Sequence, residues 1–291
     1  MPAMLVLVAP LMAAPMHYRH NAPESPLDRR YVYHWKVLET ALEKTRATHG
    51  DYVLEPGEVM TEARQLFELE RATGSLTVVY QGTTPVIERT LWPVRIPVDR
   101  DLVGYRVLLV RRERLDQFAS VRSVADLKTV TFGFGLGWLD GDVVRANGLR
   151  VVTGSSYEGL FDMLNNGRFE AFPRGAVEIL DEWQARRERY PELAIEPSLL
   201  VYYPMPMYFW FARDDVGRSL AERAEAGMRL MIADGSYDRL FAEYQDQTIV
   251  ALGLKHRRIL RLSNPLLGPE TPLQDRRLWF DPTTYQPGGR R

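Results

Sequence analysis

Two turns of small and polar residues follow apolar segments that predict strands: Gln81-Gly82-Thr83 and Gly135-Leu136-Gly137-Trp138. Open α/β sheets bind ligands at the carboxyl ends of their strands, so residues in both turns are candidate ligand contacts. Glycine lets the backbone approach a ligand closely, and the Trp138 indole can form an apolar wall or stack on a flat molecule. These residue types favour noncovalent binding of a small molecule.

The residue patterns of common catalytic sites are absent from the sequence. There is no cysteine, which excludes disulfides and thiolate metal sites. There is no Ser/His/Asp pattern, no HExxH spacing and no Walker loop, and the glycines from Gly133 to Gly137 lack GxGxxG spacing. Glu24, Asp140 and Glu178 are the carboxylates that we can place near a cleft as a general acid, and Asp140 is better explained as a helix cap. We therefore predict a protein that is not an enzyme and that holds no cofactor or metal.

The segment Val151–Phe172 predicts a strand, a helix and a second strand. Ser155 or Ser156 can cap the helix with a side-chain oxygen. The helix has one apolar face at helical spacing: Tyr157, Leu160, Phe161 and Leu164. Asn166-Gly167 supplies the left-handed residue that ends the helix. A crossover unit of this kind belongs to an α/β sheet.

The rest of the chain alternates strands with helices, and its 291 residues are enough for two lobes of α/β class, each with a mainly parallel sheet flanked by helices. We assign residues 16–113 and 205–248 to the first lobe, with its last strand at 104–110. Residues 114–204 form the second lobe, because the aromatic-rich segment 200–211 returns to the first. Residues 249–291 are basic and weakly periodic, and we expect a C-terminal extension that packs along the outside or frays.

The N-terminus has an apolar run at residues 4–14 that ends in small residues, as the cleavage region of a secretory signal does. The run is too short to span a bilayer and has no basic n-region, and Pro15 would make cleavage after Ala14 awkward. We interpret residues 1–15 as a truncated export signal; the alternative is a buried first strand from about Leu5. A formal net charge of -1 gives no electrostatic case for binding nucleic acid or an anionic membrane.

The order of elements resembles the periplasmic solute-binding proteins of family 3, the polar-amino-acid type within the type 2 periplasmic-binding fold. The resemblance covers about Met16 to Tyr244 and rests on three motifs: Ser123-Val124-Ala125-Asp126-Leu127-Lys128, the Ser156-Tyr157-Glu158 helix with Asn166-Gly167-Arg168, and Ile232-Ala233-Asp234-Gly235-Ser236-Tyr237-Asp238-Arg239-Leu240-Phe241. The last is similar to the family's closing "ADG-S/T-YDKL" helix pair. The resemblance implies two lobes that close on a small solute, a membrane permease as partner, a periplasmic location and a monomer.

The resemblance also implies a set of ligand contacts. Arg89, after the third strand, matches the arginine whose planar guanidinium pairs with the ligand carboxylate; the alternative is a surface arginine paired with Glu88. The turn around Gly135 and Trp138 matches the family's anion-binding turn before a helix, although it has no Thr or Ser. The loop after the first strand, which includes Arg19 and Glu24, lines the mouth of the cleft in such proteins.

The chain departs from the family pattern after Phe172. The amino-acid binders carry there an aspartate that receives the ligand ammonium group, whereas this chain has Pro173-Arg174-Gly175. An arginine has only donors, so a standard α-amino acid bound in the usual way is not expected. Arg174 favours a carboxylate, a phosphate or an electron-rich ring if it faces the cleft, and is an ordinary strand-end charge if it faces solvent. We therefore expect an exported binder of a small polar ligand that is anionic or aromatic, for an ABC-type importer. The alternatives are a ligand-sensing module for a membrane signalling partner and a dehydratase-like enzyme.

Overall fold

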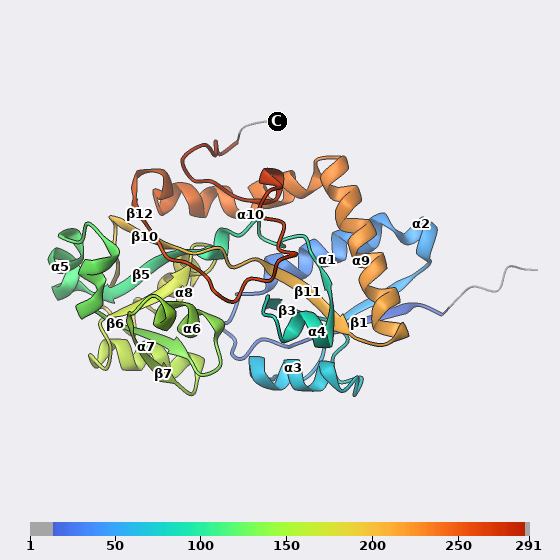
Figure 1. The fold of residues 1–291 in the computed structure, drawn as a ribbon, viewed down its shortest axis with the longest axis horizontal. Coiled ribbons are helices and arrows are strands. Elements are labelled where there is room, and N and C mark those ends of the chain that lie inside the picture. Colours follow the sequence, from blue (N-terminus) through green and yellow to red (C-terminus); the bar gives the residue numbers. More distant parts are fainter. Residues whose placement is uncertain (1–13, 289–291) are drawn as a thin grey trace, which may run out of the picture.

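The computed structural model describes residues 14–288, so residues 1–13 of the predicted export signal lie outside the described residues. The described chain forms two α/β lobes that lie side by side (Figure 1). Among residues 14–288, no helix combines the length and the apolar character needed to cross a membrane.

The first lobe contains one two-stranded and one three-stranded sheet. β1 pairs with β2 in parallel, and β11 lies between β3 and β4 and is antiparallel to both. The backbone N–H groups of Thr77 and Val78 donate to the carbonyl oxygen of Arg19, which places β1 beside the segment that leads into β3. The elements are β1 (Met16–His20), α1 (Val32–Lys44), α2 (Arg46–His49), β2 (Tyr52–Pro56), α3 (Glu62–Glu70), β3 (Val79–Gly82), α4 (Ile87–Thr90), β4 (Leu91–Val94), β11 (Met207–Ala212), α9 (Asp215–Ala233) and α10 (Ser236–Ala251).

The second lobe contains a seven-stranded mixed sheet of order β12-β10-β5-β8-β6-β7, with β9 also paired to β5. β6 is parallel to β7 and β8, whereas β5 is antiparallel to β8, β9 and β10. The elements are β5 (Tyr105–Arg111), α5 (Leu115–Ala119), β6 (Thr131–Gly135), α6 (Leu139–Ala146), β7 (Arg150–Gly154), α7 (Tyr157–Asn165), β8 (Ala171–Gly175), α8 (Ile179–Arg186), β9 (Leu193–Ile195), β10 (Leu199–Tyr202) and β12 (Arg258–Arg261).

β5 lies in the second sheet, whereas the sequence analysis assigns the strand at 104–110 to the first lobe. Residues Tyr105–Val110 are all buried, and a continuous apolar run fits a central strand of either sheet. The register, with Leu109 opposite Phe172, shows that the partner of β5 is β8. The chain therefore crosses from the first lobe to the second at residues 95–104, returns at residues 203–206, and crosses to the second lobe again between α10 and β12.

The first two crossings, at residues 95–104 and 203–206, are joined through Asp101. Its carboxylate accepts hydrogen bonds from the Met205 backbone N–H (2.8 Å) and from the Tyr202 hydroxyl (3.1 Å). Gly104 permits this close approach, because a Cβ there would lie 2.7 Å from the carbonyl oxygen of Tyr203. The crossings therefore pack against each other and form one hinge.

The strand–helix–strand unit predicted at Val151–Phe172 is confirmed as β7, α7 and the start of β8. Ser156 is the residue that caps α7, because its hydroxyl accepts a hydrogen bond from the Gly159 backbone N–H (3.2 Å). The predicted apolar face of α7 is buried in the second lobe: Tyr157, Leu160, Phe161 and Leu164. β8 (Ala171–Gly175) continues from this unit to Arg174.

Helices α1 and α9 cross at very short range in the first lobe. A Cβ at Gly227 of α9 would lie 2.1 Å from the carbonyl oxygen of Ala41 in α1. The buried apolar side chains of these helices belong to one cluster that continues through the hinge to α7 and β8. The two lobes therefore share a core on the hinge side.

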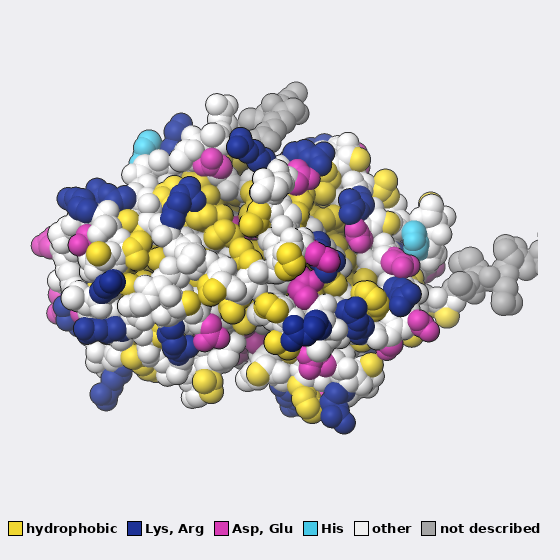
Figure 2. Space-filling model, viewed as in Figure 1, with side chains coloured by type: hydrophobic (Ala, Val, Ile, Leu, Met, Phe, Trp, Pro, Cys, Tyr) yellow, Lys and Arg dark blue, Asp and Glu magenta, His cyan; other side chains and the backbone are white. Residues whose placement is uncertain are grey.

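The C-terminal segment, residues 262–288, follows β12 and runs across the molecule from the second lobe to the first, in red in Figure 1. Ser263 bonds to Asn147 at the end of α6, and the Asn264 amide donates to the Pro204 carbonyl at the hinge (2.8 Å). Glu270 then pairs with Arg95 beside β4 (2.9 Å). On this face, hydrophobic side chains gather near the middle while Lys and Arg are spread over both lobes (Figure 2). The extension is thus packed along the outside, as one of the two predicted alternatives requires.

Candidate functional site

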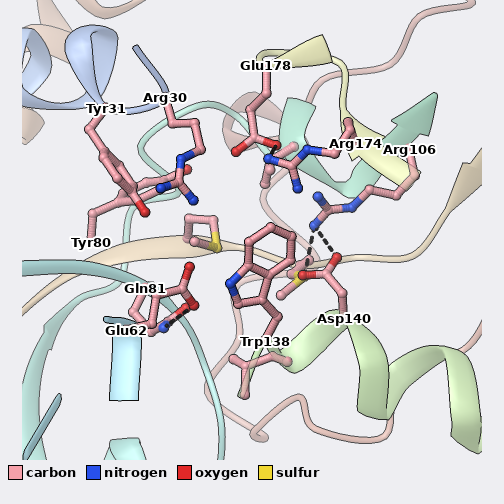
Figure 3. A pocket seen from close by; sticks show the side chains of 14 residues that line it. Arg30, Tyr31, Glu62, Tyr80, Gln81, Arg106, Trp138, Asp140, Arg174 and Glu178 are labelled. Atoms are coloured by element: carbon pink, nitrogen blue, oxygen red, sulfur yellow. Dashed lines mark hydrogen bonds and ion pairs between the residues drawn. The ribbon is translucent and has the colours of Figure 1, made fainter. Parts of the chain in front are cut away.

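A small cavity lies between the two lobes beside the hinge, with a volume of about 40 Å³. This volume holds roughly three water molecules, so the lobes are closed on each other here. Charged and aromatic side chains from both lobes line it (Figure 3), together with apolar residues and Gln81: Arg30, Tyr31, Glu62, Tyr80, Gln81, Val103, Arg106, Trp138, Leu139, Asp140, Arg174, Glu178, Met205 and Met207.

Arg174, at the end of β8, lies buried in the cavity wall. Its Nε and Nη2 atoms donate to the two carboxylate oxygens of Glu182 (2.8 and 2.7 Å), and Nη2 also lies 2.9 Å from Glu178. Its guanidinium carbon is 4.8 Å from the centre of a Trp138 ring. Of the two alternatives left open by the sequence, Arg174 faces the cleft, and its guanidinium is already bound by carboxylates.

The two glutamates on Arg174 differ in their electrostatics. Burial acts to raise the pKa of Glu182, but Arg174 and the Tyr157 hydroxyl outweigh it and lower the pKa below its usual value. Burial raises the pKa of Glu178 despite the nearby arginine, because Glu178 receives a single guanidinium contact. Glu182 is therefore the firmly ionised partner of Arg174, and Glu178 the more easily protonated one.

Arg106 and Asp140 form a second buried ion pair. Arg106 Nη2 lies 2.6 Å from Asp140 Oδ1, which also accepts a hydrogen bond from the Tyr203 hydroxyl (2.5 Å). The expectation that Asp140 caps a helix is wrong, because Trp138 is the capping residue of α6 and the Asp140 carboxylate turns to Arg106. The sequence analysis missed Arg106; a single charge within the apolar strand Tyr105–Val110 is the signal that could have revealed it.

Arg30 occupies the first-lobe side of the cavity. Asp28 holds its Nε and Nη2 at 2.8 Å each, and Glu24 lies 2.8 Å from Nη2. The guanidinium carbon stands 4.1 Å from the ring centre of Tyr157, in the second lobe. Glu24, predicted as a ligand contact, thus holds Arg30. The loop that carries both residues joins the lobes across the cleft.

Glu62 opens helix α3 and approaches the cavity from the first lobe. Its Oε2 accepts a hydrogen bond from the Gln81 side-chain amide (3.1 Å), and within residues 14–288 it has no ion-pair partner. Burial raises the pKa of Glu62, and the more distant charge of Arg30 offsets this only in part. Glu62 is therefore a partly buried carboxylate aimed at the cavity without a cation to neutralise it. No spacing of residues marks Glu62 in the sequence, because α3 is amphipathic and mostly exposed.

Of the residues predicted to contact a ligand, Gln81, Trp138 and Arg174 line the cavity. Gly82 and Gly135 lie at its edge, where a Cβ would come within 3.0 Å of Leu139 and 2.4 Å of the Trp138 indole respectively. Both glycines therefore allow neighbouring side chains to close over the strand ends.

The other predicted contacts lie elsewhere. Thr83 is buried and donates to Glu88 (2.9 Å), and Arg19 pairs with Glu55 at the surface (2.8 Å). Arg89 is exposed on α4 and does not line the cavity, and Glu88 pairs with Arg95 instead of Arg89. The residue types and spacing after the third predicted strand do not tell whether an arginine there is exposed or faces the cleft. We assign no ligand contact to Arg89.

Within the described part of the chain, no cluster of His, Asp or Glu side chains is arranged to hold a metal ion. The carboxylates of the cavity instead bind arginines or, for Glu62, an amide. The arrangement can therefore recognise a polar molecule through charges, hydrogen bonds and aromatic faces.

Comparison with solved structures finds this fold in proteins of low sequence identity. An ancestral arginine-binding protein bound to arginine is 17% identical with a TM-score of 0.54, over 80% of this chain and 99% of that chain. The substrate-binding protein of an amino acid ABC transporter is 16% identical with a TM-score of 0.51, over 79% and 99%. A histidine kinase sensor domain with similarity to periplasmic binding proteins is 14% identical with a TM-score of 0.56, over 80% and 96%. No protein-family model and no curated protein sequence matches the chain.

These structures are matched over nearly their whole length, whereas about a fifth of this chain has no counterpart in them. At such identities the likeness establishes the fold and leaves the ligand open. The α/β class and the two-lobed architecture expected from the sequence are confirmed. The protein therefore has the fold of the periplasmic solute-binding proteins.

Proposed function

We propose that the protein is an exported, periplasmic solute-binding protein that closes its lobes on a small polar ligand for an ABC-type importer. The observation that carries this proposal is the cavity between the lobes, which both lobes line with charged and aromatic side chains. A ligand that contacts both lobes favours the closed population over the open one. The likeness in fold to a substrate-binding protein of an amino acid ABC transporter supports transport as the role.

Among the residues predicted from sequence, we propose Gln81 and Trp138 as ligand contacts, with Arg174 holding Glu178 and Glu182 in the cavity wall, and we add Glu62 from the structure. The aromatic part of the expected ligand chemistry is supported by the rings of the cavity wall: Tyr31, Tyr80 and Trp138. Asp140 and Glu178, which the sequence analysis considered as general acids, are held in ion pairs, which supports binding rather than catalysis. The expectation of a monomer comes from the family resemblance and remains part of this proposal.

The test is a thermal-shift screen of small amines, amino acids, organic acids and phosphates, followed by the same measurement on two variants. A ligand at a hundred times its Kd stabilises the folded state by about 2.7 kcal/mol. Trp138→Ala removes a cavity wall and is expected to abolish most of this stabilisation, whereas the exposed Arg89→Ala leaves it unchanged. Stabilisation that survives Trp138→Ala would place the ligand elsewhere. Turnover of a stabilising compound would favour an enzyme.

A ligand-sensing module is the second candidate, because a histidine kinase sensor domain shares this fold. Such a module would act on a separate membrane partner. A permease and an ATPase encoded beside the gene would favour transport, and a signalling protein encoded there would favour sensing.

A further inference from the structure

We infer that the ligand of the cavity is a small organic cation that carries no carboxylate, such as an amine or a guanidinium compound. The inference rests on the proposed function, because it names the chemistry of the ligand that the two lobes enclose. It replaces the anion expected from sequence, and it also excludes amino acids, which carry a carboxylate.

The arginines of the cavity already have buried carboxylate partners. Arg174 is held by Glu182 and Glu178, and its side chain is 3% exposed. Arg106 is held by Asp140, and its side chain is 4% exposed. A ligand carboxylate that took the place of one of these partners would leave it buried without its counter-charge, which costs several kcal/mol. The Arg106 Nε is the donor of this pair that has no partner among the described residues.

Arg30 is occupied in the same way. Asp28 takes two of its nitrogens, and Glu24 takes a third contact. Its side chain is 3% exposed, and one face of its guanidinium stacks on Tyr157. All three arginines on the cavity wall therefore have internal carboxylate partners.

The charged side chains that line the cavity balance at full ionisation, with three arginines, Arg30, Arg106 and Arg174, against three carboxylates, Glu62, Asp140 and Glu178. Three further carboxylates hold these arginines from behind the wall: Glu24, Asp28 and Glu182. The arginines and all six carboxylates together carry a net charge of minus three. A further negative charge from a ligand is disfavoured in this setting, and a positive charge is favoured.

Glu62 is the carboxylate of this set that is best placed to contact a ligand. It faces the cavity from α3 with an amide as its polar partner, and Glu178 approaches from the second lobe (Figure 3). A cation between them would contact one carboxylate from each lobe and so favour closure. Burial raises the pKa of both groups, as expected of carboxylates that lack sufficient positive charge nearby.

The aromatic side chains of the cavity suit the same ligand. Tyr31 and Trp138 already lie near guanidinium groups, with Arg30 at 5.0 Å and Arg174 at 4.8 Å from the ring centres. Aromatic faces attract cations through their quadrupole. The Tyr80 hydroxyl is buried without a hydrogen-bond partner among the described residues, so it can accept from a ligand N–H.

The experiment compares ligands that differ by a carboxylate, using isothermal titration calorimetry on the full chain. The pairs are methylamine with glycine and ethylamine with L-alanine, whose amines suit a cavity that holds about three water molecules, and formate serves as a simple anion. We expect at least one of the two amines to bind roughly thirtyfold or more tightly than its carboxylate-bearing partner, and formate not to bind. The inference would be overturned by binding of formate, by an amino acid that binds as tightly as its amine or more tightly, or by failure of both amines to bind.

Two matched variants locate the effect. Glu62→Gln keeps the shape and removes the charge, and it is expected to weaken binding of the amine by roughly tenfold or more. Glu70→Gln, at the exposed end of the same helix, leaves the affinity unchanged. Unchanged affinity in Glu62→Gln, with thermal unfolding like that of the wild type, would overturn the inference. A screen in which a compound of another charge binds in the cavity would refute only the ligand class, whereas a screen in which no compound binds would refute the proposed function.

Discussion

Arg174 holds two glutamates in the second lobe, and replacing it with methionine is expected to destabilise the protein by about 3–5 kcal/mol. Methionine fills much of the space of the arginine side chain, so the loss of stability comes mainly from removing the positive charge. Three contacts shorter than 3.0 Å disappear, and Glu182, whose side chain is 5% exposed, loses its cation. A charge-assisted hydrogen bond is worth roughly 1.5–3 kcal/mol, and protonation of a stranded glutamate recovers part of the total.

Urea unfolding at pH 7, followed by fluorescence, measures this loss. With a slope of about 3 kcal/mol/M for a chain of this size, the midpoint is expected to fall by roughly 1 M or more. Arg229→Met is the control, because Arg229 makes the same kind of pair with Glu225 on α9 but is 69% exposed. That substitution is expected to cost about 0.5 kcal/mol or less.

The pH dependence gives an independent check. Glu182 has a lowered pKa in the folded protein, so its pairing stabilises the fold above the ordinary pKa of a glutamate and loses this effect as the pH falls below that value. The gap in stability between the wild type and Arg174→Met should therefore narrow in acid. An Arg174→Met loss no larger than that of Arg229→Met, or a gap that widens in acid, would refute the assignment of Arg174 as a buried, ion-paired residue.

Three further predictions concern the ligand and the fold. Because burial raises the pKa of Glu62 and Glu178, protons compete with a bound amine. The affinity for the amine should therefore rise as the pH increases above the ordinary pKa of a glutamate and then level off, and a flat or falling profile in calorimetry would contradict this. Ser156→Ala removes the cap of α7 and should lower the free energy of unfolding, measured in urea, by about 1 kcal/mol. An unchanged free energy of unfolding would show that the cap is dispensable. Gly227→Ala drives a methyl group into the backbone of α1 at Ala41 and should cost about 1–3 kcal/mol, whereas a neutral or stabilising effect would show that the helices can separate freely.

The local elements could be predicted because their causes are local. The cap, apolar face and glycine stop of the unit from Val151 to Phe172 are all encoded within that segment, and the structure contains each of them. The sheet to which β5 belongs could not be predicted, because an apolar run encodes burial and carries no information about which neighbour covers it. Strand pairing depends on residues far away in the chain.

The candidate site was predicted in outline, at the strand ends that carry Gln81 and Trp138. Its electrostatics were not predictable, because they depend on contacts between elements. Arg174 considered alone predicts that the ligand is an anion. In the fold, however, the charge of Arg174 is neutralised by Glu182, which lies one turn into α8. Similarly, the packing of β5 against β8 and β10 places Arg106 beside the cavity, whereas Arg89 lies exposed on α4.

The C-terminal segment gives the two lobes a further mechanical connection beside the three crossings of the chain, at residues 95–104, at residues 203–206 and between α10 and β12. It is attached to the second lobe at Asn147 and to the first at Arg95, so separating the lobes must stretch it or break one of those contacts. Such a tether restricts the number of open arrangements that the empty protein can sample. A ligand then removes less disorder when it closes the cleft, so the tether preorganises the site and favours tight capture over wide opening.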